Sequence, residues 1–204
     1  YVCVDAPAGK YVSASSAMYA TDASAGYYVP STGLTNQTAC SPGTYQALIS
    51  QSSCDSATVG HYVDSYLGTG QSSQTPCLSG TYNPNTGSTS PSACADADAG
   101  YYVPSTGQSS QTECSIGTFQ TATSQAFCDD ASAGFYVPLT GQLSQTPCSP
   151  GTYQSATGQI ICENADAGYY VDSTLGSAQT SQTACSAGTY NTNTGSTTPA
   201  DCLD

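Results

Sequence analysis

The sequence predicts a fold of small disulfide-rich repeats, mostly β-hairpins and irregular turns, joined into an elongated, solenoid-like rod without a large hydrophobic core. Three observations predict it: regularly spaced cysteines, a recurring Gly-aromatic-Tyr-Val motif, and few aliphatic residues. The chain has 11 cysteines in 204 residues. From Cys40 to Cys202 the successive gaps are 14, 23, 17, 20, 14, 20, 14, 23 and 17 residues. Such internal periodicity is typical of repeat proteins.

Two kinds of segment alternate between the cysteines. The longer kind carries Gly-aromatic-Tyr-Val and closes with Gln-Thr-x-Cys; its copies lie at 26–29, 60–63, 100–103, 134–137 and 168–171, with a partial copy at 9–12. The shorter kind begins Cys-x-x-Gly-Thr and continues with an aromatic residue, which is Tyr45, Tyr82, Phe119, Tyr153 or Tyr190. Gly-aromatic-Tyr-Val predicts a strand of three or four residues, and Thr-Gly pairs predict turns. No segment has a sustained helical period.

One long and one short segment make a repeat of 34 or 40 residues. The predicted boundaries are 1–19 for a partial N-terminal repeat, 20–53 for repeat 1, 54–93 for repeat 2 (long form), 94–127 for repeat 3, 128–161 for repeat 4, and 162–204 for repeat 5 (long form). In the long forms Asp64 and Asp172 replace the turn proline found at Pro30. Loop length therefore varies while the cysteine spacing holds.

The composition explains why cysteines are needed. Leu, Ile, Val and Phe together number 24 of 204 residues, too few to offset the conformational entropy lost on folding. A disulfide that closes a loop of about 15 residues stabilises the folded state by roughly 3 kcal/mol. Disulfides persist in oxidising compartments, so we expect an extracellular protein, secreted or at the cell surface. Structural zinc is disfavoured because no Cys-x-x-Cys pair is present.

The incomplete first repeat bears on the disulfide pairing, because Ala20 stands where the spacing predicts a cysteine. Bridges across the long segments would leave three cysteines unpaired, namely Cys3, Cys40 and Cys202. Bridges across the short segments leave only Cys3, as an unpaired or intermolecular thiol. The second scheme, which we favour as a hypothesis, pairs Cys40 with Cys54, Cys77 with Cys94, Cys114 with Cys128, Cys148 with Cys162, and Cys185 with Cys202.

The short segments resemble a known kind of module. Cys40-Ser41-Pro42-Gly43-Thr44-Tyr45, running to Cys54, is similar to the cysteine-rich repeats of tumour necrosis factor receptors and the ephrin-receptor-like repeats of long extracellular proteins. The resemblance implies one bridge across each short segment and an elongated rod. Those families place further cysteines between modules, whereas one cysteine stands at each boundary here, so receptor function is not carried over.

The charge restricts the partners. With 14 acidic residues and one basic residue the net charge is −13, which excludes nucleic acid as a natural partner. No apolar stretch is long enough to cross a bilayer, so no direct membrane insertion is expected. We predict no cofactor. Calcium is possible at acidic residues that follow cysteines, but solvated acidic turns are favoured because a calcium site needs six to eight oxygen ligands. These residues are Asp96 with Asp98, Asp129 with Asp130, and Glu163 with Asp166.

Two aromatic slots recur in the long segments. The first is chemically diverse and is expected to be exposed, at Tyr27, Tyr101, Phe135 and Tyr169. The second is always Tyr and is expected to form the local core. The Gln of each Gln-Thr pair is expected to hydrogen-bond backbone groups of a turn. Asn36 is the one N-glycosylation sequon, and the Ser/Thr-rich tracts are typical of O-glycosylation.

An enzyme is not expected, because the single histidine, His61, occupies an interchangeable slot and no catalytic grouping accompanies it. The favoured hypothesis is a structural component of an extracellular fibre, stalk or surface coat. It would be glycosylated and would self-associate end to end into a filament. The alternative is a cell-surface adhesion or ligand-binding ectodomain that uses the exposed aromatic slots.

Overall fold

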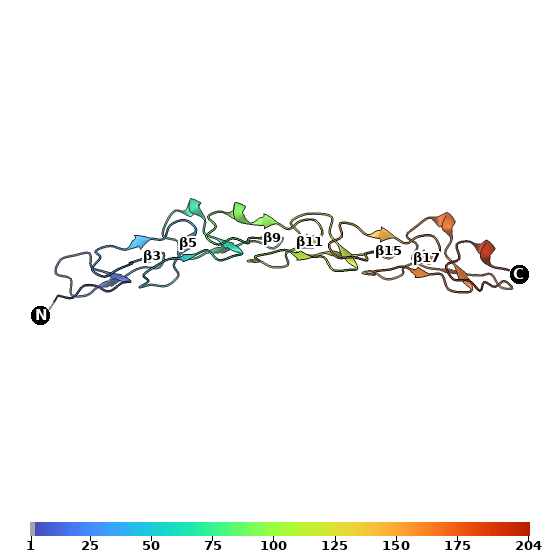
Figure 1. Ribbon diagram of the computed structural model, residues 1–204, viewed down its shortest axis with the longest axis horizontal. Helices are drawn as coiled ribbons and strands as arrows, with labels where there is room; N and C mark the ends of the chain where they lie inside the picture. Colours follow the sequence, from blue (N-terminus) through green and yellow to red (C-terminus); the bar gives the residue numbers. More distant parts are fainter. Residues whose placement is uncertain (1–2) are drawn as a thin grey trace. The chain divides into compact units, whose positions relative to one another are not determined.

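A computed structural model describes residues 3–204, so the first two residues of the predicted repeat 1–19 lie outside the described residues. The described chain consists of small disulfide-linked hairpins (Figure 1), formed by ten antiparallel pairs of two-residue strands and four short 3-10 helices. The strands are shorter than the three or four residues expected from the sequence. None of the described helices is long and apolar enough to span a bilayer.

The strands pair with their neighbours along the chain. The pairs are β1 (Lys10–Tyr11) with β2 (Thr21–Asp22), β3 (Tyr27–Tyr28) with β4 (Thr38–Ala39), β5 (Thr44–Tyr45) with β6 (Asp55–Ser56), β7 (His61–Tyr62) with β8 (Thr75–Pro76), β9 (Thr81–Tyr82) with β10 (Ala95–Asp96), β11 (Tyr101–Tyr102) with β12 (Thr112–Glu113), β13 (Thr118–Phe119) with β14 (Asp129–Asp130), β15 (Phe135–Tyr136) with β16 (Thr146–Pro147), β17 (Thr152–Tyr153) with β18 (Glu163–Asn164), and β19 (Tyr169–Tyr170) with β20 (Thr183–Ala184).

The 3-10 helices account for the extra residues of the two 40-residue repeats. They are η1 (Ser65–Leu67), η2 (Pro91–Ala93), η3 (Ser173–Leu175) and η4 (Pro199–Asp201). The Asp64 and Asp172 carboxylates cap η1 and η3 by accepting the amides of Tyr66 and Thr174. A proline opens η2 and η4, as is common at the first helical position. The aspartates in place of proline thus mark helix starts.

The structural unit is a module about half the length of a predicted repeat. Each module begins at a small residue, has a left-handed glycine three residues later, and continues into the first strand of a hairpin. The eleven modules, numbered 1 to 11, begin at Ala6, Ala23, Cys40, Ala57, Cys77, Ala97, Cys114, Ala131, Cys148, Ala165 and Cys185. They begin 17 or 20 residues apart, so long and short segments share one backbone plan.

The core is correspondingly thin. Ten of the eleven starting residues are buried, as are the valines that follow the second aromatic slot: Val29, Val63, Val103, Val137 and Val171. In all five cysteine-type modules the position of the valine holds a buried Gln or Asn. The second-slot tyrosines are only half-buried, so the expectation that they form the local core was wrong. Side chains of successive extended residues point to opposite sides, and here the valine points inward.

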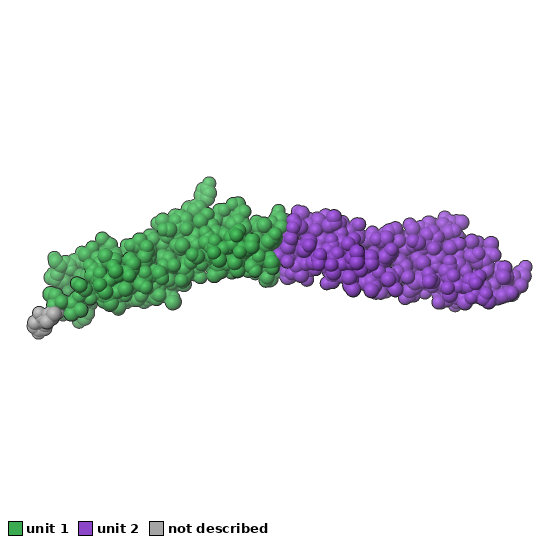
Figure 2. All heavy atoms as spheres, viewed as in Figure 1, with its two compact units in different colours: residues 1–96, 105–110 green, residues 97–104, 111–204 purple. Residues whose placement is uncertain are grey.

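The chain divides into two compact units (Figure 2). Unit 1 extends to Asp96 and includes Ser105–Ser110, and unit 2 comprises Ala97–Pro104 and Gln111–Asp204. Both units contain the same hydrogen-bond pattern, two disulfides in unit 1 and three in unit 2. Each unit is therefore held together by module-to-module contacts.

Candidate interaction surface between stacked modules

Two ladders of backbone hydrogen bonds join each module to the next. In the first, the residue after the strand donates to the loop of the following module, as when Gln120 N–H donates to the Gln142 carbonyl at 3.1 Å. In the second, a loop residue donates back to the starting residue of the preceding module, as when Gly141 N–H donates to the Cys114 carbonyl at 2.9 Å. Both bonds recur at all ten successive module pairs. Neighbouring modules thus satisfy each other's backbone groups.

The loop residue that donates in the second ladder always has a positive φ. The residues in this loop position are Ser16, Gly33, Ser50, Gly70, Gly87, Gly107, Ser124, Gly141, Gly158, Ala178 and Gly195. Four of them are not glycine and are the only described non-glycine residues with positive φ. The left-handed conformation turns the amide of the loop residue back toward the preceding module. This conformation is kept even at the serines and the alanine, whose side chains disfavour a positive φ.

A closer contact joins modules two places apart. In eight modules the glycine three residues after the module start faces the loop carbonyl of the second module along the chain. An added Cβ would approach that oxygen closer than real Cβ atoms do. The pairs are Gly9 with Ser50, Gly26 with Gly70, Gly43 with Gly87, Gly60 with Gly107, Gly100 with Gly141, Gly117 with Gly158, Gly134 with Ala178, and Gly151 with Gly195. Each module therefore leaves room for the second one after it.

The disulfides close the short segments. They join Cys40 with Cys54, Cys77 with Cys94, Cys114 with Cys128, Cys148 with Cys162, and Cys185 with Cys202, with Cα atoms 5.7–5.8 Å apart. Each bridge links the start of a cysteine-type module to the residue that precedes its second strand. In the first module both positions are alanine, at Ala6 and Ala20. Cys3 is exposed and is the one free cysteine among residues 3–204.

The aromatic slots are less exposed than the sequence suggested. Tyr27, Tyr101 and Phe135 are half-buried, and Tyr169 is 38% exposed. Tyr27 is half-buried because its ring packs over the loop glycine two modules along, where a Cβ added to Gly70 would lie 3.2 Å from the ring. Tyr169 belongs to module 10, and no described module lies two places beyond it. The ring of Tyr27 is thus covered by the second module along the chain.

The glutamine of each Gln-Thr pair bonds the backbone of its own hairpin. Its side-chain oxygen accepts an amide from the residue after the module start, as from Asp98 to Gln111 at 2.7 Å. The same bond occurs at Gln37, Gln74, Gln145 and Gln182. Gln111 also donates to the Asp98 carboxylate at 2.7 Å, and Gln182 does so to Asp166. These two carboxylates therefore already have amide partners.

A second set of glutamines was missed from the sequence. Gln46, Gln120 and Gln154 are buried, and each bridges its own loop by donating to one carbonyl and accepting one amide. Gln154 donates to the Ile161 carbonyl at 3.0 Å and accepts from the Ala156 amide at 3.0 Å. Their position could have revealed them, because they follow Thr-aromatic where the long segments have valine.

Few charged groups interact. Lys10 pairs with Asp22 at 2.8 Å, and hydrogen bonds from Lys10 and then Ser50 lower the pKa of Asp22. Hydrogen bonds from the Thr174 side chain and amide lower the pKa of Asp172. Partial burial, followed by the charge of Glu163, raises the pKa of Tyr153. Within residues 3–204 no group of three or more His, Cys, Asp or Glu residues is arranged to hold a metal.

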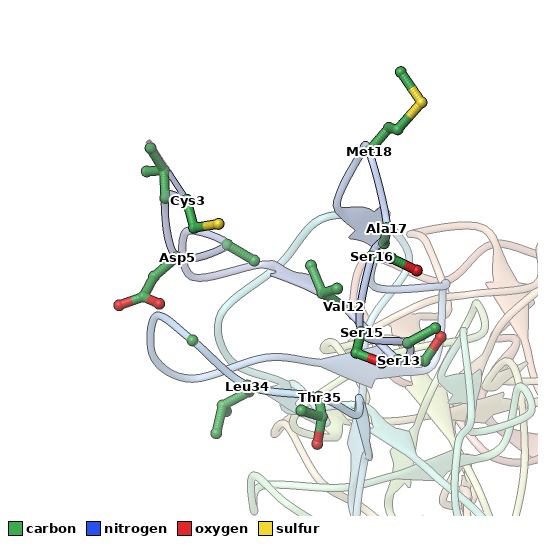
Figure 3. Close-up of a pocket in the computed structure, with 14 residues that line it drawn as sticks. Cys3, Asp5, Val12, Ser13, Ser15, Ser16, Ala17, Met18, Leu34 and Thr35 are labelled. Atoms are coloured by element: carbon green, nitrogen blue, oxygen red, sulfur yellow. The ribbon is translucent and has the colours of Figure 1, made fainter. Parts of the chain in front are cut away.

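The first module borders an open pocket of about 880 Å³ (Figure 3). Cys3 and Asp5 lie on one side of it, and the loop of Ser16 and Ala17 lies on the other, with Val12 between them. In every later module the corresponding space is occupied by the hairpin of the preceding module, which bonds to the same backbone positions. The sequon residue Asn36 lies outside the pocket and is exposed.

Comparisons with known proteins supply no family for this chain. No protein-family model matches it, and no curated protein matches it significantly. The arrangement supports repeated stacking of modules, in which each of the two facing modules supplies one ladder donor and one ladder acceptor.

Proposed function

We propose that this protein is a structural component of an extracellular fibre, stalk or surface coat. One observation carries the proposal: both hydrogen-bond ladders recur at every one of the ten module junctions. In repeat proteins whose modules contact only near neighbours, added modules extend the array along one direction. We propose that the array forms an elongated, solenoid-like rod. Bearing load or spanning distance is the function that suits such a rod.

The cysteines support an extracellular location. Five disulfides occur in a chain whose buried residues are mostly alanine, cysteine and valine. Such bridges are stable in oxidising surroundings and would be reduced in a cytosol. Each closed loop of about 15 residues stabilises the fold by roughly 3 kcal/mol, which matters in a chain with so thin a core.

Glycosylation and crosslinking would suit the same role. Asn36 is exposed and lies in the sequon Asn36-Gln37-Thr38, and many serines and threonines of the loops are exposed. Hydroxyl-rich, exposed tracts of secreted proteins are typical carriers of O-linked glycans. The exposed thiol of Cys3 is available for an intermolecular disulfide.

The adhesion hypothesis has less support. Three of the four aromatic slots are half-buried, which leaves less ring surface for a ligand. The single histidine, His61, lies in the equivalent slot of another module, where its Nδ1 is 3.0 Å from the Val59 carbonyl oxygen. We therefore propose a structural role, without catalysis and without a resident cofactor.

Imaging of native material tests the proposal. Antibodies raised against the 204-residue protein should label extracellular fibres or a surface coat, and the labelled chain should carry intramolecular disulfides and lose mass when its glycans are removed. Labelling confined to the cell interior, on chains with free thiols, would reject an extracellular structural role. Pre-immune serum on the same sections is the control.

A further inference from the structure

An exposed aromatic side chain and an apolar pocket lie in the same part of the chain, modules 4 and 5. Tyr66, in η1, is 96% exposed, and Leu67 beside it is 68% exposed. Other modules precede and follow these two, so this exposure does not arise from where the sequence begins or ends. Most of the described tyrosines are half-buried. Tyr66 therefore differs from them in presenting nearly all of its surface to a partner.

The turn that carries Tyr66 is held by hydrogen bonds to its backbone. The Asp64 carboxylate accepts the Tyr66 amide at 2.9 Å, and the Ser65 amide donates to the Thr89 carbonyl of module 5 at 2.8 Å. In the other 40-residue repeat the same two bonds hold η3, where Thr174 takes the place of Tyr66. The fold therefore does not need an aromatic side chain at this position. A fixed backbone also lowers the entropy that is lost on binding.

The apolar pocket lies over the Cys77–Cys94 disulfide and has a volume of about 260 Å³. Its walls include Tyr62, Pro76, Leu78 and Pro91, and Leu78 is 71% exposed. None of the residues that line the pocket is charged. A tyrosine ring suits such a space, because its faces are apolar and its hydroxyl can stay in water at the rim.

The exposed ring and the apolar walls of the pocket occur in only one of the two 40-residue repeats. Residues 54–93 and 162–201 align without a gap, and the other positions that line the pocket are identical in both. Three differences between the repeats bear on these features: Thr174 in place of Tyr66, Ala184 in place of Pro76, and Ser186 in place of Leu78. The ring and two of the apolar walls are therefore lost together.

The charge distribution favours a second copy of this chain as the partner. Each copy has a net charge of −13, so two copies repel each other wherever their acidic residues face. Residues 65–95 contain no charged side chain and are bordered by Asp64 and Asp96. A neutral ring that enters a neutral pocket brings no carboxylate of its own into the contact. This segment is therefore a place where two copies can meet despite their charge.

We infer that Tyr66 of one copy inserts into the pocket over the Cys77–Cys94 disulfide of a neighbouring copy. Its ring packs there against Leu78 and the two prolines. A single ring in a single pocket buries far less than the roughly 1,000 Å² of a stable interface. Association of isolated chains is therefore weak, and it strengthens where many copies are held together. The contact goes beyond the proposed structural function, and only its strengthening in a coat or fibre rests on that function.

Sedimentation of the oxidised 204-residue protein tests the inference, in a Cys3→Ser background that removes random crosslinks. The average mass of the parent should rise above 20.6 kDa with concentration. Tyr66→Thr and Leu78→Ser should each weaken association at least tenfold. Both introduce the residue that the other 40-residue repeat has at that place, so the hairpins should still fold. Leu139→Ser is the matched control, because Leu139 is exposed to a similar extent, 63%, but lies in module 8.

Mixing the two variants separates this contact from general adhesion of apolar surfaces. Tyr66→Thr keeps the pocket and Leu78→Ser keeps the ring, so an equimolar mixture should associate although each variant alone stays monomeric. A mixture that fails to associate would overturn the inference, as would a monomeric parent or a Tyr66→Thr protein that associates like the parent. The antibody labelling decides the extracellular role separately, so the two failures can be told apart.

Discussion

Gly117 lies directly beneath the backbone carbonyl of Gly158, two modules further along, with no room for a Cβ between them. Gly168 is the equivalent residue of module 10 and has nearly the same φ, 84° against 81°, but its surroundings are open. This pair separates the two reasons for a glycine at this position. One is the left-handed backbone, and the other is the close approach of a second module.

We predict that Gly117→Ala destabilises the protein more than Gly168→Ala. Both should lose about 1–2 kcal/mol to the left-handed backbone, and Gly117→Ala should lose about 1–3 kcal/mol more by overpacking. Urea unfolding of each oxidised variant, followed by tyrosine fluorescence, measures the difference. Equal losses would mean that the contact with Gly158 has no energetic effect.

At the loop residue that donates in the second ladder, replacing alanine by glycine should raise the stability of the fold. Ala178 is an alanine at φ 65° where most modules have glycine, so Ala178→Gly should stabilise the protein by about 0.5–1 kcal/mol, the relief of strain less the entropy of glycine. Gly195→Ala is the reverse change at the next loop, where the nearest described atom lies at 3.7 Å. It should destabilise by a similar amount. A change of the same sign in both variants would contradict the strain argument.

The alanines at positions 6 and 20 mark a missing disulfide. They are 14 residues apart, as are Cys40 and Cys54, and occupy the same places in the hairpin. Ala6→Cys with Ala20→Cys, in a Cys3→Ser background, should form a sixth bridge and stabilise the first module by about 3 kcal/mol. Peptide mapping without reduction should find the new link. Each single variant serves as a control, and two free thiols in the double variant would refute the equivalence.

Replacing a buried glutamine should lower the free energy of unfolding more than replacing an exposed one. Gln154→Met leaves the Ile161 carbonyl and the Ala156 amide without their side-chain partner, which we expect to cost about 1–3 kcal/mol. Gln159→Met removes an exposed bond to the Thr157 carbonyl and should change stability by less than about 0.5 kcal/mol. Thermal melts of the two variants measured side by side test the contrast. Similar melting temperatures would count against it.

The Lys10–Asp22 pair predicts a dependence on acid pH. The pKa of Asp22 is lowered in the folded state, so the pair contributes stability above the ordinary aspartate pKa of about 4, and this is lost as pH falls through the lower folded value. Asp22→Asn should therefore be less stable than the parent at pH 6, and the two should converge toward pH 2. A constant difference between pH 6 and pH 2 would exclude this explanation.

The repeating cysteine frame was the part of the fold that the sequence could predict. Conserved gaps around Cys40 and Cys54 restrict which loops can close, and the glycine-aromatic motifs mark hairpins regardless of loop length. The equivalence of long and short segments was not apparent, because Ala97 and Cys114 look chemically unrelated. They share only a backbone role, since both accept the amide of the next loop, from Ser124 and Gly141.

Side-chain exposure was harder to predict than backbone plan. Tyr27 faces a loop glycine that lies 43 residues further along, and no local pattern announces a contact between modules two places apart. The valine after each Tyr pair was likewise overlooked, because large aromatic rings usually dominate a core. In modules this small, the space inside admits only alanine, cysteine, valine or a hydrogen-bonded amide.

The position of the cystines leaves such a protein free to change length by whole modules. Each cystine lies within a single hairpin, from the start of its module to the residue before the second strand. A genetic duplication or deletion of one complete module therefore leaves no thiol stranded, whether or not that module carries a cystine. Only a break inside a cysteine-type module would separate the two cysteines of a pair.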